Sequence, residues 1–183
     1  MTPNYSAWAA RWRVPLGFGF AMAYAVVSRP RLPYVVAGGV VALLGLILRG
    51  LAAGYIEKSR SLATAGPFAY TRNPLYLGSF ILGAGFVIAG AFWILAAVYV
   101  PLFTLVYLPV MRNEEYYLHQ KFGREFEEYA KVVPLFFPIP GRGVRGVGNF
   151  HWAQFRNNRE YNAAAGYLVM MVFLGIKMAL RLP

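Results

Sequence analysis

The sequence predicts an all-α membrane protein, a single polytopic helix bundle of about five transmembrane helices with an amphipathic helix on its cytosolic side. Composition is the first observation behind this prediction. Apolar residues make up 58% of the 183 residues and charged residues 14%, proportions typical of polytopic membrane proteins. The second observation is that the apolar residues form long runs, and a helix of about 20 apolar residues spans a bilayer.

The first part of this membrane domain, residues 14–56, is expected to be a helical hairpin. Residues 14–28 form a short apolar run, and the Pro- and Arg-rich residues 29–33 indicate a turn. Residues 34–48 form the second run. We expect its helix to continue past Arg49, because a long basic side chain can snorkel to the interface while its stem stays among apolar groups.

The middle part, residues 57–138, is expected to hold a polar connector (57–73), a second hairpin and an amphipathic helix. Residues 75–111 carry no charge and would form a helix of roughly 55 Å, too long for one span, so we place a turn at residues 90–93. The following residues, 112–132, are predicted to be one polar helix. Its apolar stripe at helical spacing consists of Leu118, Phe122, Phe126, Tyr129 and Val133.

The last part, residues 139–183, is expected to be a loop followed by a helix over the apolar run 163–182, which Lys177 interrupts. The loop spells GxGxxG at residues 141–146. No strand precedes this motif, so an interfacial loop is favoured over dinucleotide binding. His151 with the adjacent tryptophan is typical of an interfacial anchor, with a catalytic imidazole as the alternative.

The basic residues indicate contact with a membrane. The net charge is +11, and the bases lie at the ends of apolar runs, which favours an anionic membrane surface over nucleic acid as their partner. If five helices alternate in direction, most bases fall on one side, which the positive-inside rule assigns to the cytosol. Arg29 and Arg31 oppose this assignment, whereas it is supported by Arg11, Arg13, Lys58, Arg60, Arg72 and the bases from Arg112 to Arg159.

The chain contains no cysteine, which excludes disulfides and thiolate nucleophiles. Its two histidines, His119 and His151, show no metal-ligand spacing. We therefore expect no metal site.

The segment "GPFAYTRNPLYLG", residues 66–78, places polar groups at the start of an apolar helix. Pro74 restricts Asn73 to extended backbone and can begin the next helix in its first turn. Arg72, Asn73 and Tyr76 are therefore expected at the cytosolic mouth of that helix. Further along, Gly83 and Gly85 permit either close helix packing, which is the commoner use of glycine in membranes, or close approach of a flat ligand.

Two adjacent carboxylates, Glu114 and Glu115, lie at the membrane end of the predicted polar helix. Glu115 projects into its apolar stripe, and Glu114 lies at the edge of that stripe. Carboxylates in such a place are costly without a partner. The alternative is that both simply occupy the first turn after Asn113 as N-cap, where they suit the helix dipole. The later acids Glu125, Glu127 and Glu128 are expected to form a solvated face.

Two motifs in this sequence resemble the signature of the isoprenylcysteine carboxyl methyltransferase and phospholipid methyltransferase superfamily. The resemblance covers residues 66–138. The first motif is matched by Arg72, Pro74, Tyr76 and Gly78, and the second by Glu114, Glu115, Leu118, Phe122, Gly123 and Tyr129, with Phe126 in place of a tyrosine. One position departs from the pattern, because Asn73 stands where the family has histidine, and an amide cannot accept a proton near neutral pH.

The resemblance implies an integral membrane methyltransferase that uses S-adenosylmethionine. The cofactor-binding residues that it implies are Tyr70, Asn73, Tyr76, Gly83, Gly85, Glu114 and Glu115. A carboxylate pair suits the sulfonium, ammonium and ribose groups of this cofactor, and Arg112 or Arg72 could bind its carboxylate. The implied catalytic residues are Arg72, Asn73, Tyr76 and Arg112.

The resemblance leaves the methyl acceptor open among a lipophilic or small carboxylate, thiol or amine that reaches the cytosolic membrane face. Two other functions stay open. One is an NADPH-dependent membrane reductase of the sterol reductase type, which the paired glutamates disfavour because they would repel a 2′-phosphate. The other is a non-catalytic membrane scaffold, which Asn73 favours. The residues indicate no oligomeric state.

Overall fold

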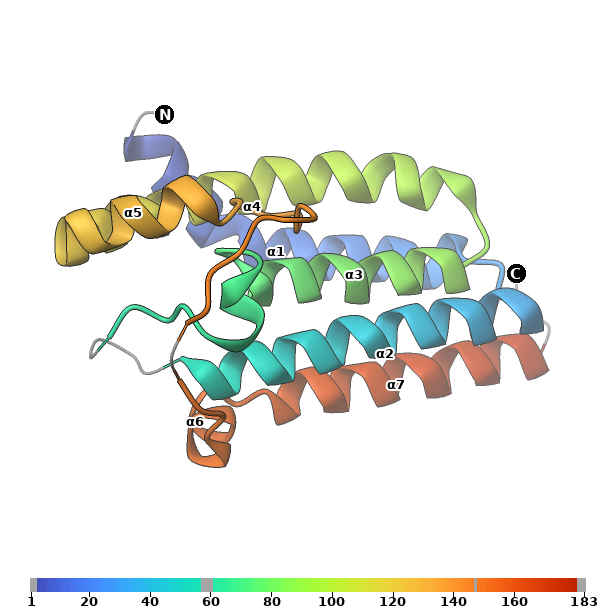
Figure 1. The fold of residues 1–183 in the computed structure, drawn as a ribbon. Coiled ribbons are helices and arrows are strands. Elements are labelled where there is room, and N and C mark those ends of the chain that lie inside the picture. Colours follow the sequence, from blue (N-terminus) through green and yellow to red (C-terminus); the bar gives the residue numbers. More distant parts are fainter. Residues whose placement is uncertain (1–2, 57–60, 147, 181–183) are drawn as a thin grey trace.

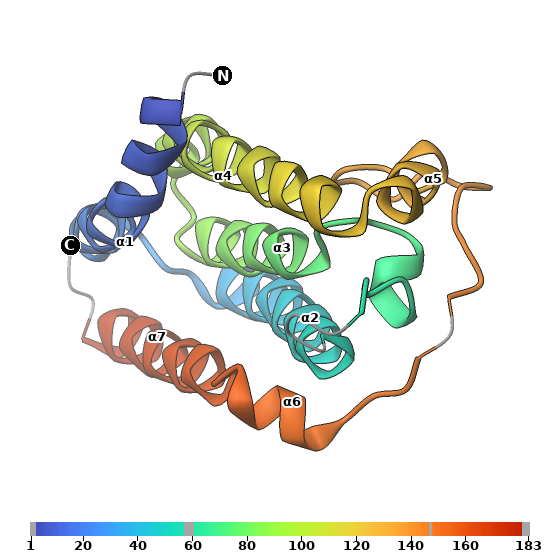
Figure 2. The same ribbon diagram turned by 90° about the vertical axis from the view of Figure 1, so that its left-hand side faces the viewer.

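The structure is a computed structural model that describes residues 3–56, 61–146 and 148–180. Five long helices lie side by side, and shorter helices gather at one end of the bundle (Figures 1 and 2). The long helices are α1 (Pro3–Val27), α2 (Leu32–Tyr55), α3 (Pro74–Ala89), α4 (Trp93–Phe122) and α7 (Tyr161–Ala179). The short ones are the 3-10 helix η1 (Gly66–Ala69), α5 (Arg124–Val132) and α6 (Trp152–Asn157). No strand occurs in the described ranges, so the predicted all-α class is confirmed.

Three helices among the described residues, α2, α4 and α7, are long and apolar enough to cross a membrane. The helix α3 is also apolar but has only 16 residues. The predicted first run, residues 14–28, lies in the longer helix α1, which begins at Pro3 and so includes Arg11 and Arg13. The chain is thus a helical membrane protein, as its composition predicted.

The helices α2 and α3 touch backbone to backbone along much of their length. A Cβ atom added at Gly45 would lie 2.6 Å from the carbonyl oxygen of Gly78, and one added at Gly85 would lie 2.5 Å from the oxygen of Gly38. Small residues allow such close approach in membranes, where packing and not hydrophobic burial joins helices. The glycine positions therefore fix the pairing of these two helices.

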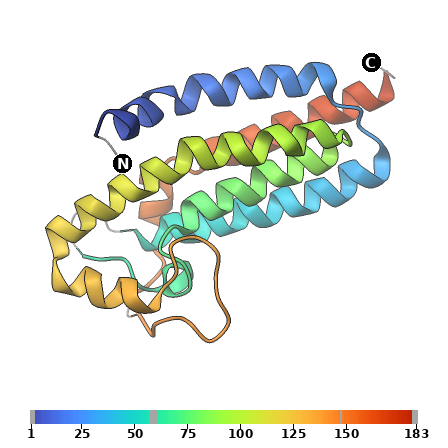
Figure 3. The ribbon, with the colours of Figure 1, turned by 90° about the horizontal axis from the view of Figure 1, so that it is seen from above.

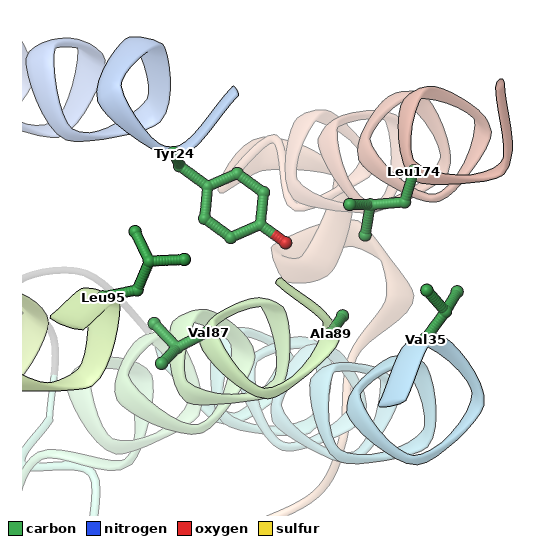
Figure 4. Packing of buried hydrophobic residues seen from close by; sticks show 6 residues of the cluster. All are labelled: Tyr24, Val35, Val87, Ala89, Leu95 and Leu174. Atoms are coloured by element: carbon green, nitrogen blue, oxygen red, sulfur yellow. The ribbon is translucent and has the colours of Figure 1, made fainter. Parts of the chain in front are cut away.

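At the opposite end of the bundle from the short helices, a buried cluster joins α1, α2, α3, α4 and α7. Its members are Tyr24, Val35, Val87, Ala89, Leu95 and Leu174 (Figure 4). The Tyr24 hydroxyl donates a 2.7 Å hydrogen bond to the carbonyl oxygen of Phe86. Nearby, the buried Lys177 ammonium donates to the carbonyl oxygens of Ala25 and Val26, at the C-terminal end of α1. Lys177, which interrupts the last apolar run, therefore caps the C-terminal end of α1.

The predicted turn at residues 90–93 is confirmed, because α3 ends at Ala89 and α4 begins at Trp93. The prediction of one helix over residues 112–132 is wrong. Residues 112–122 continue α4, and α5 starts only after Gly123. That glycine has a φ of 51°, which is left-handed backbone that glycine adopts without the cost a side chain brings.

The break at Gly123 changes the place of the two glutamates. Glu114 and Glu115 lie well inside α4, so they do not occupy a first turn and Asn113 is not an N-cap. The apolar stripe survives the break because the chain folds back at Gly123 (Figure 3). Side chains from both sides of it form one cluster around Phe126 and Tyr129, which also includes Leu62, Val133, Leu118 and Phe122.

The basic residues divide between the two ends of the bundle much as expected. The start of α1, residues 61–73 of the connector, α5 and α6 lie at one end, and the α1–α2 and α3–α4 turns lie at the other (Figure 1). Arg72 and the bases from Arg112 to Arg159 belong to the first end, and Arg29 and Arg31 to the second. Lys58 and Arg60 lie outside the described residues, as do residues 181–183, where the last run was expected to end.

Candidate functional site

The connector is tied to the chain that follows α5 by three hydrogen bonds. The Thr71 hydroxyl donates to the carbonyl oxygen of Phe136 over 2.6 Å, and the Arg72 backbone N–H donates to that of Pro134 over 2.9 Å. The Asn73 side-chain amide donates to the carbonyl oxygen of Leu135 over 3.0 Å. Asn73 is buried, so its amide holds the connector in place.

Arg72 and Glu115 form an ion pair across the two motifs. Their Nη1 and Oε1 atoms lie 2.6 Å apart, and both side chains are largely buried. Within the part of the chain that the structure describes, the buried Nε of Arg72 donates no hydrogen bond, and Oε1 of Glu115 accepts none of proper geometry. The pair thus has unused hydrogen-bonding capacity in a buried place, where it is costly.

Glu115 lies beyond the apolar part of α4, which ends at Met111. Burial raises the pKa of its carboxyl above the usual glutamate value, and the Arg72 and Arg112 guanidiniums oppose that rise. The ionised carboxylate is therefore held at a cost that a cationic ligand would lower.

Glu114, from the second motif, contacts Tyr76 of the first motif. The Tyr76 hydroxyl, in the first turn of α3, donates a 3.2 Å hydrogen bond to Oε2 of Glu114. The Tyr76 ring also packs beside that of Tyr107 in α4, with centroids 5.7 Å apart. The two sequence motifs therefore meet through two separate pairs of side chains.

A cavity of about 250 Å³ lies where these residues meet. Its polar wall includes Arg72, Asn73, Glu114 and Glu115. Its apolar wall includes Leu62, Phe68, Leu118, Phe122, Phe126 and Tyr129, from the connector, the end of α4 and α5. We call this the first cavity.

A second cavity of about 350 Å³ adjoins the first, since Phe68, Arg72, Asn73 and Glu114 line both. It extends toward the bundle. The residues that line the second cavity and not the first include Arg13, Arg49, Tyr76, Ser79 and Tyr107.

Tyr129 supports the floor of the first cavity. Its hydroxyl donates a 2.7 Å hydrogen bond to the carbonyl oxygen of Phe68, and burial raises the pKa of this phenol, so it stays a donor. Tyr129→Phe is expected to lower the free energy of unfolding by about 1 kcal/mol, because the buried carbonyl loses its partner. Melting in detergent would show this. The exposed Tyr161→Phe serves as control, and an equal effect in both variants would contradict the assignment.

Five of the predicted site residues come together here, namely Arg72, Asn73, Tyr76, Glu114 and Glu115. Four others line neither cavity. Tyr70 is exposed beside Gly143, and Arg112 is exposed on α4. The position of Gly83 is covered by the Tyr99 ring and that of Gly85 by α2, so packing, the commoner use of such glycines, describes their surroundings.

Sequence reasoning missed one ion pair at this end of the bundle. Arg49 donates from Nε to Oε2 of Glu160 over 3.1 Å and from Nη2 to Oε1 over 2.9 Å, and its Nη1 contacts the Ser79 hydroxyl. The helix α2 continues past Arg49 to Tyr55, as predicted, and Arg49 binds Glu160 at that end of the helix. The available signal was that Arg49 is the one charge within α2 and Glu160 the one acid after Glu128.

The remaining acidic residues agree with the solvated face that was predicted. His119 pairs with Glu127 over 2.7 Å and Arg124 with Glu128 over 2.9 Å, with all four side chains at least half exposed. The GxGxxG segment lies in a loop, and Trp152 begins α6 with 70% of its surface exposed.

Comparison with known proteins identifies the family of this segment. The phospholipid methyltransferase family model matches residues 35–125. The chain is 36% identical over 88 residues to the protein-S-isoprenylcysteine O-methyltransferase of Schizosaccharomyces pombe, which covers 45% of this chain and 35% of that protein. No solved structure gives a significant match.

Two further relatives carry names for metal resistance. The chain is 40% identical over 85 residues to the nickel-cobalt-cadmium resistance protein NccN of Alcaligenes xylosoxydans xylosoxydans. It is 38% identical over 84 residues to the cobalt-zinc-cadmium resistance protein CzcN of Cupriavidus metallidurans. Each match covers 45% of this chain and 38% of the relative, so the similarity spans less than two fifths of these curated proteins.

The family model ends at Glu125, so it covers the first motif and the second motif as far as Gly123. In the structure, residues of both motifs line one cavity. With the relative from fission yeast, this shows that residues 35–125 belong to the superfamily of isoprenylcysteine carboxyl methyltransferases and phospholipid methyltransferases.

Proposed function

We propose that this protein is an integral membrane methyltransferase that uses S-adenosylmethionine and methylates a lipophilic or small acceptor at the cytosolic face of the membrane. The observation that carries the proposal is the first cavity. There the paired carboxylates of one motif meet Arg72 of the other, at the end of the apolar helices, and Glu114 also accepts a hydrogen bond from Tyr76, which lines the adjoining second cavity.

The chemistry of the first cavity fits S-adenosylmethionine. Glu114 and Glu115 offer carboxylates to its cationic groups and its ribose hydroxyls. The buried Nε of Arg72, without a hydrogen-bond partner among the described residues, offers a donor to its carboxylate. The aromatic wall around Phe68, Phe122 and Phe126 suits a flat adenine. When bound, this cofactor supplies the methyl group on a sulfonium centre.

The protein's own part in such a reaction is to bind, orient and exclude water, since displacement at a methyl group requires alignment of the reactants. Tyr76, held by Glu114, lines the second cavity as an orienting group. Asn73 is no base, because its amide is held by Leu135 and cannot accept a proton near neutral pH. An acceptor that arrives ionised agrees best with this site.

Calorimetry on the purified protein tests the proposal directly. We expect S-adenosylhomocysteine to bind, and incubation with S-adenosylmethionine labelled in the methyl group to transfer label to components of a membrane extract. NADPH is the comparison ligand. Binding of NADPH with hydride transfer, and no binding of S-adenosylhomocysteine, would replace this function by that of a membrane reductase.

A further inference from the structure

The loop that follows α5 brings together two features that the first and second cavities do not include. One is the GxGxxG segment, residues 141–146, and the other is Tyr70, which was predicted to bind the cofactor. They meet in a separate cavity of about 470 Å³, whose walls are Tyr70 and residues 138–145. We call this the third cavity.

Contacts between the loop and the connector hold the third cavity in shape. The backbone N–H of Val144 donates a 3.1 Å hydrogen bond to the carbonyl oxygen of Ala69. Gly141 has a φ of 78°, where glycine is favoured, and a Cβ atom added at Gly143 would lie only 3.0 Å from the Ala69 oxygen. The glycines of this segment therefore let the loop turn and lie against the connector, a use that requires no nucleotide.

The third cavity carries positive charge without an acidic partner. Arg142 and Arg145 line it, and the described residues of its wall include no acid. Neither arginine belongs to the four ion pairs found in the described part of the chain, and along the sequence the nearest acids are Glu128 and Glu160. Tyr70, 61% exposed, adds a hydroxyl donor. Two guanidinium groups with a phenol are donors that suit a phosphate group.

The start of the same loop lies against the apolar helices. The rings of Phe136 and Phe137 pack edge-on against Phe80 of α3, with centroids 5.8 and 6.0 Å away. Phe137 is nevertheless 60% exposed, and Ile139, in the wall of the third cavity, is 44% exposed. The loop runs out to one side of the helices, at the end of the bundle that holds α5 (Figures 2 and 3). Exposed apolar side chains therefore border the basic cavity where the apolar helices end.

We propose that the third cavity binds the head group of an anionic phospholipid, with Arg142 and Arg145 on its phosphate and with Phe137 and Ile139 among the upper parts of its acyl chains. A soluble phosphate compound would use the two arginines but not the exposed apolar side chains. A lipid uses both, as at other interfacial sites where basic and apolar side chains act together. This lipid is a binding partner and not the methyl acceptor, so the proposal does not depend on the proposed reaction.

The position of the third cavity gives such a lipid a structural role. Residues 134–136, which accept three hydrogen bonds from residues 71–73 of the connector, directly precede the loop residues that form the cavity. A lipid held by residues 138–145 therefore anchors the connector, and with it Arg72, at the level of the head groups.

Native mass spectrometry of the full-length protein in a neutral detergent tests the proposal. The probes are phosphatidylglycerol and phosphatidylcholine with identical oleoyl chains, so that only the head group differs. We expect saturable binding of phosphatidylglycerol, tighter than that of phosphatidylcholine by about 10-fold, which lies between the factors expected for one and for two bases at an anionic surface. Hydrogen exchange locates the lipid, and we expect phosphatidylglycerol to protect residues 139–146.

The informative variant combines Arg142→Gln with Arg145→Gln. Both side chains are exposed and outside the ion pairs found among the described residues, so we expect the fold to persist. The variant should bind phosphatidylglycerol about 10-fold more weakly, no better than phosphatidylcholine. Its control combines Arg156→Gln with Arg159→Asn, which removes the same charge from exposed positions in and after α6. Asparagine tolerates the φ of 55° at residue 159, and affinity should be unchanged.

Three results would contradict the lipid site. They are equal binding of the two lipids by the wild type, equal losses in the variant and its control, and protection outside residues 139–146 alone. Glycerol 3-phosphate is the soluble comparison, and displacement of the lipid by an equal concentration of it would assign the cavity to a soluble phosphate compound instead. A preparation that binds phosphatidylglycerol as expected but not S-adenosylhomocysteine would contradict the proposed methyltransferase function and leave the lipid site in place.

Discussion

Glu115→Gln is expected to weaken binding of S-adenosylhomocysteine by roughly 100-fold, since loss of one partner from a buried charge pair costs about 2–5 kcal/mol. The product retains the ammonium group and the ribose diol of the cofactor, so it probes the carboxylate without turnover. Glu115 is ion-paired only with Arg72 among the described residues and lines the first cavity. The amide of glutamine keeps the shape of the side chain and removes the charge. Isothermal calorimetry gives the dissociation constants.

The control for this experiment is Glu125→Gln, which removes the same charge from an exposed position on α5. Its affinity should match that of the wild type. Melting curves must accompany both variants, because Arg72 loses its ion-pair partner in the first. If Glu115→Gln does not fold, Glu114→Gln tests the same carboxylate pair at an exposed position. Unchanged affinity in a folded variant would remove the glutamates from the site.

Gly85→Ala is expected to lower the free energy of unfolding by about 1–3 kcal/mol, the usual cost of inserting a carbon into a packed contact. The new Cβ atom would lie 2.5 Å from the carbonyl oxygen of Gly38 and 2.7 Å from the Cα of Ala42. Both are backbone atoms of α2, so the two helices must separate. Thermal melting in detergent measures the loss.

Gly175→Ala is the matched control, because no atom lies within 4 Å of the added Cβ and alanine favours a helix over glycine. The pair of variants also distinguishes the two roles considered for Gly85, helix packing and cofactor binding. Packing predicts a lower melting temperature with unchanged affinity for S-adenosylhomocysteine in the folded fraction. A role in binding the cofactor predicts the reverse, a loss of affinity with unchanged melting.

Several features of the fold could be predicted because they depend on local properties of the chain. The apolar stretch from Leu75 to Met111 exceeds one bilayer span, so a turn was required. The turn lies between Ala89 and Trp93 and includes Gly90. Pro74 begins α3 because proline suits the first turn of a helix and does not suit its interior. Run length and proline position therefore placed these helices correctly.

The break between α4 and α5 was not predicted, since glycine is compatible with a helix as well as with a turn. The cluster around Phe126 and Tyr129 determines that the helix ends at Gly123, because it packs against the connector only if the chain reverses there. Tertiary contact thus overrode the continuous helical pattern of residues 112–132.

By itself, the sequence determined the helical membrane class, the turn between α3 and α4, and the two motifs that supply the charged groups, because each depends on composition or on neighbours along the chain. Only the tertiary structure decided which charges meet. Arg72 lies far from Glu115 in sequence, as Arg49 does from Glu160, yet both pairs form where helices of opposite direction end together. Ionised groups at the edge of a low-dielectric bundle must find a partner, and only the packing of helices brings that partner within reach.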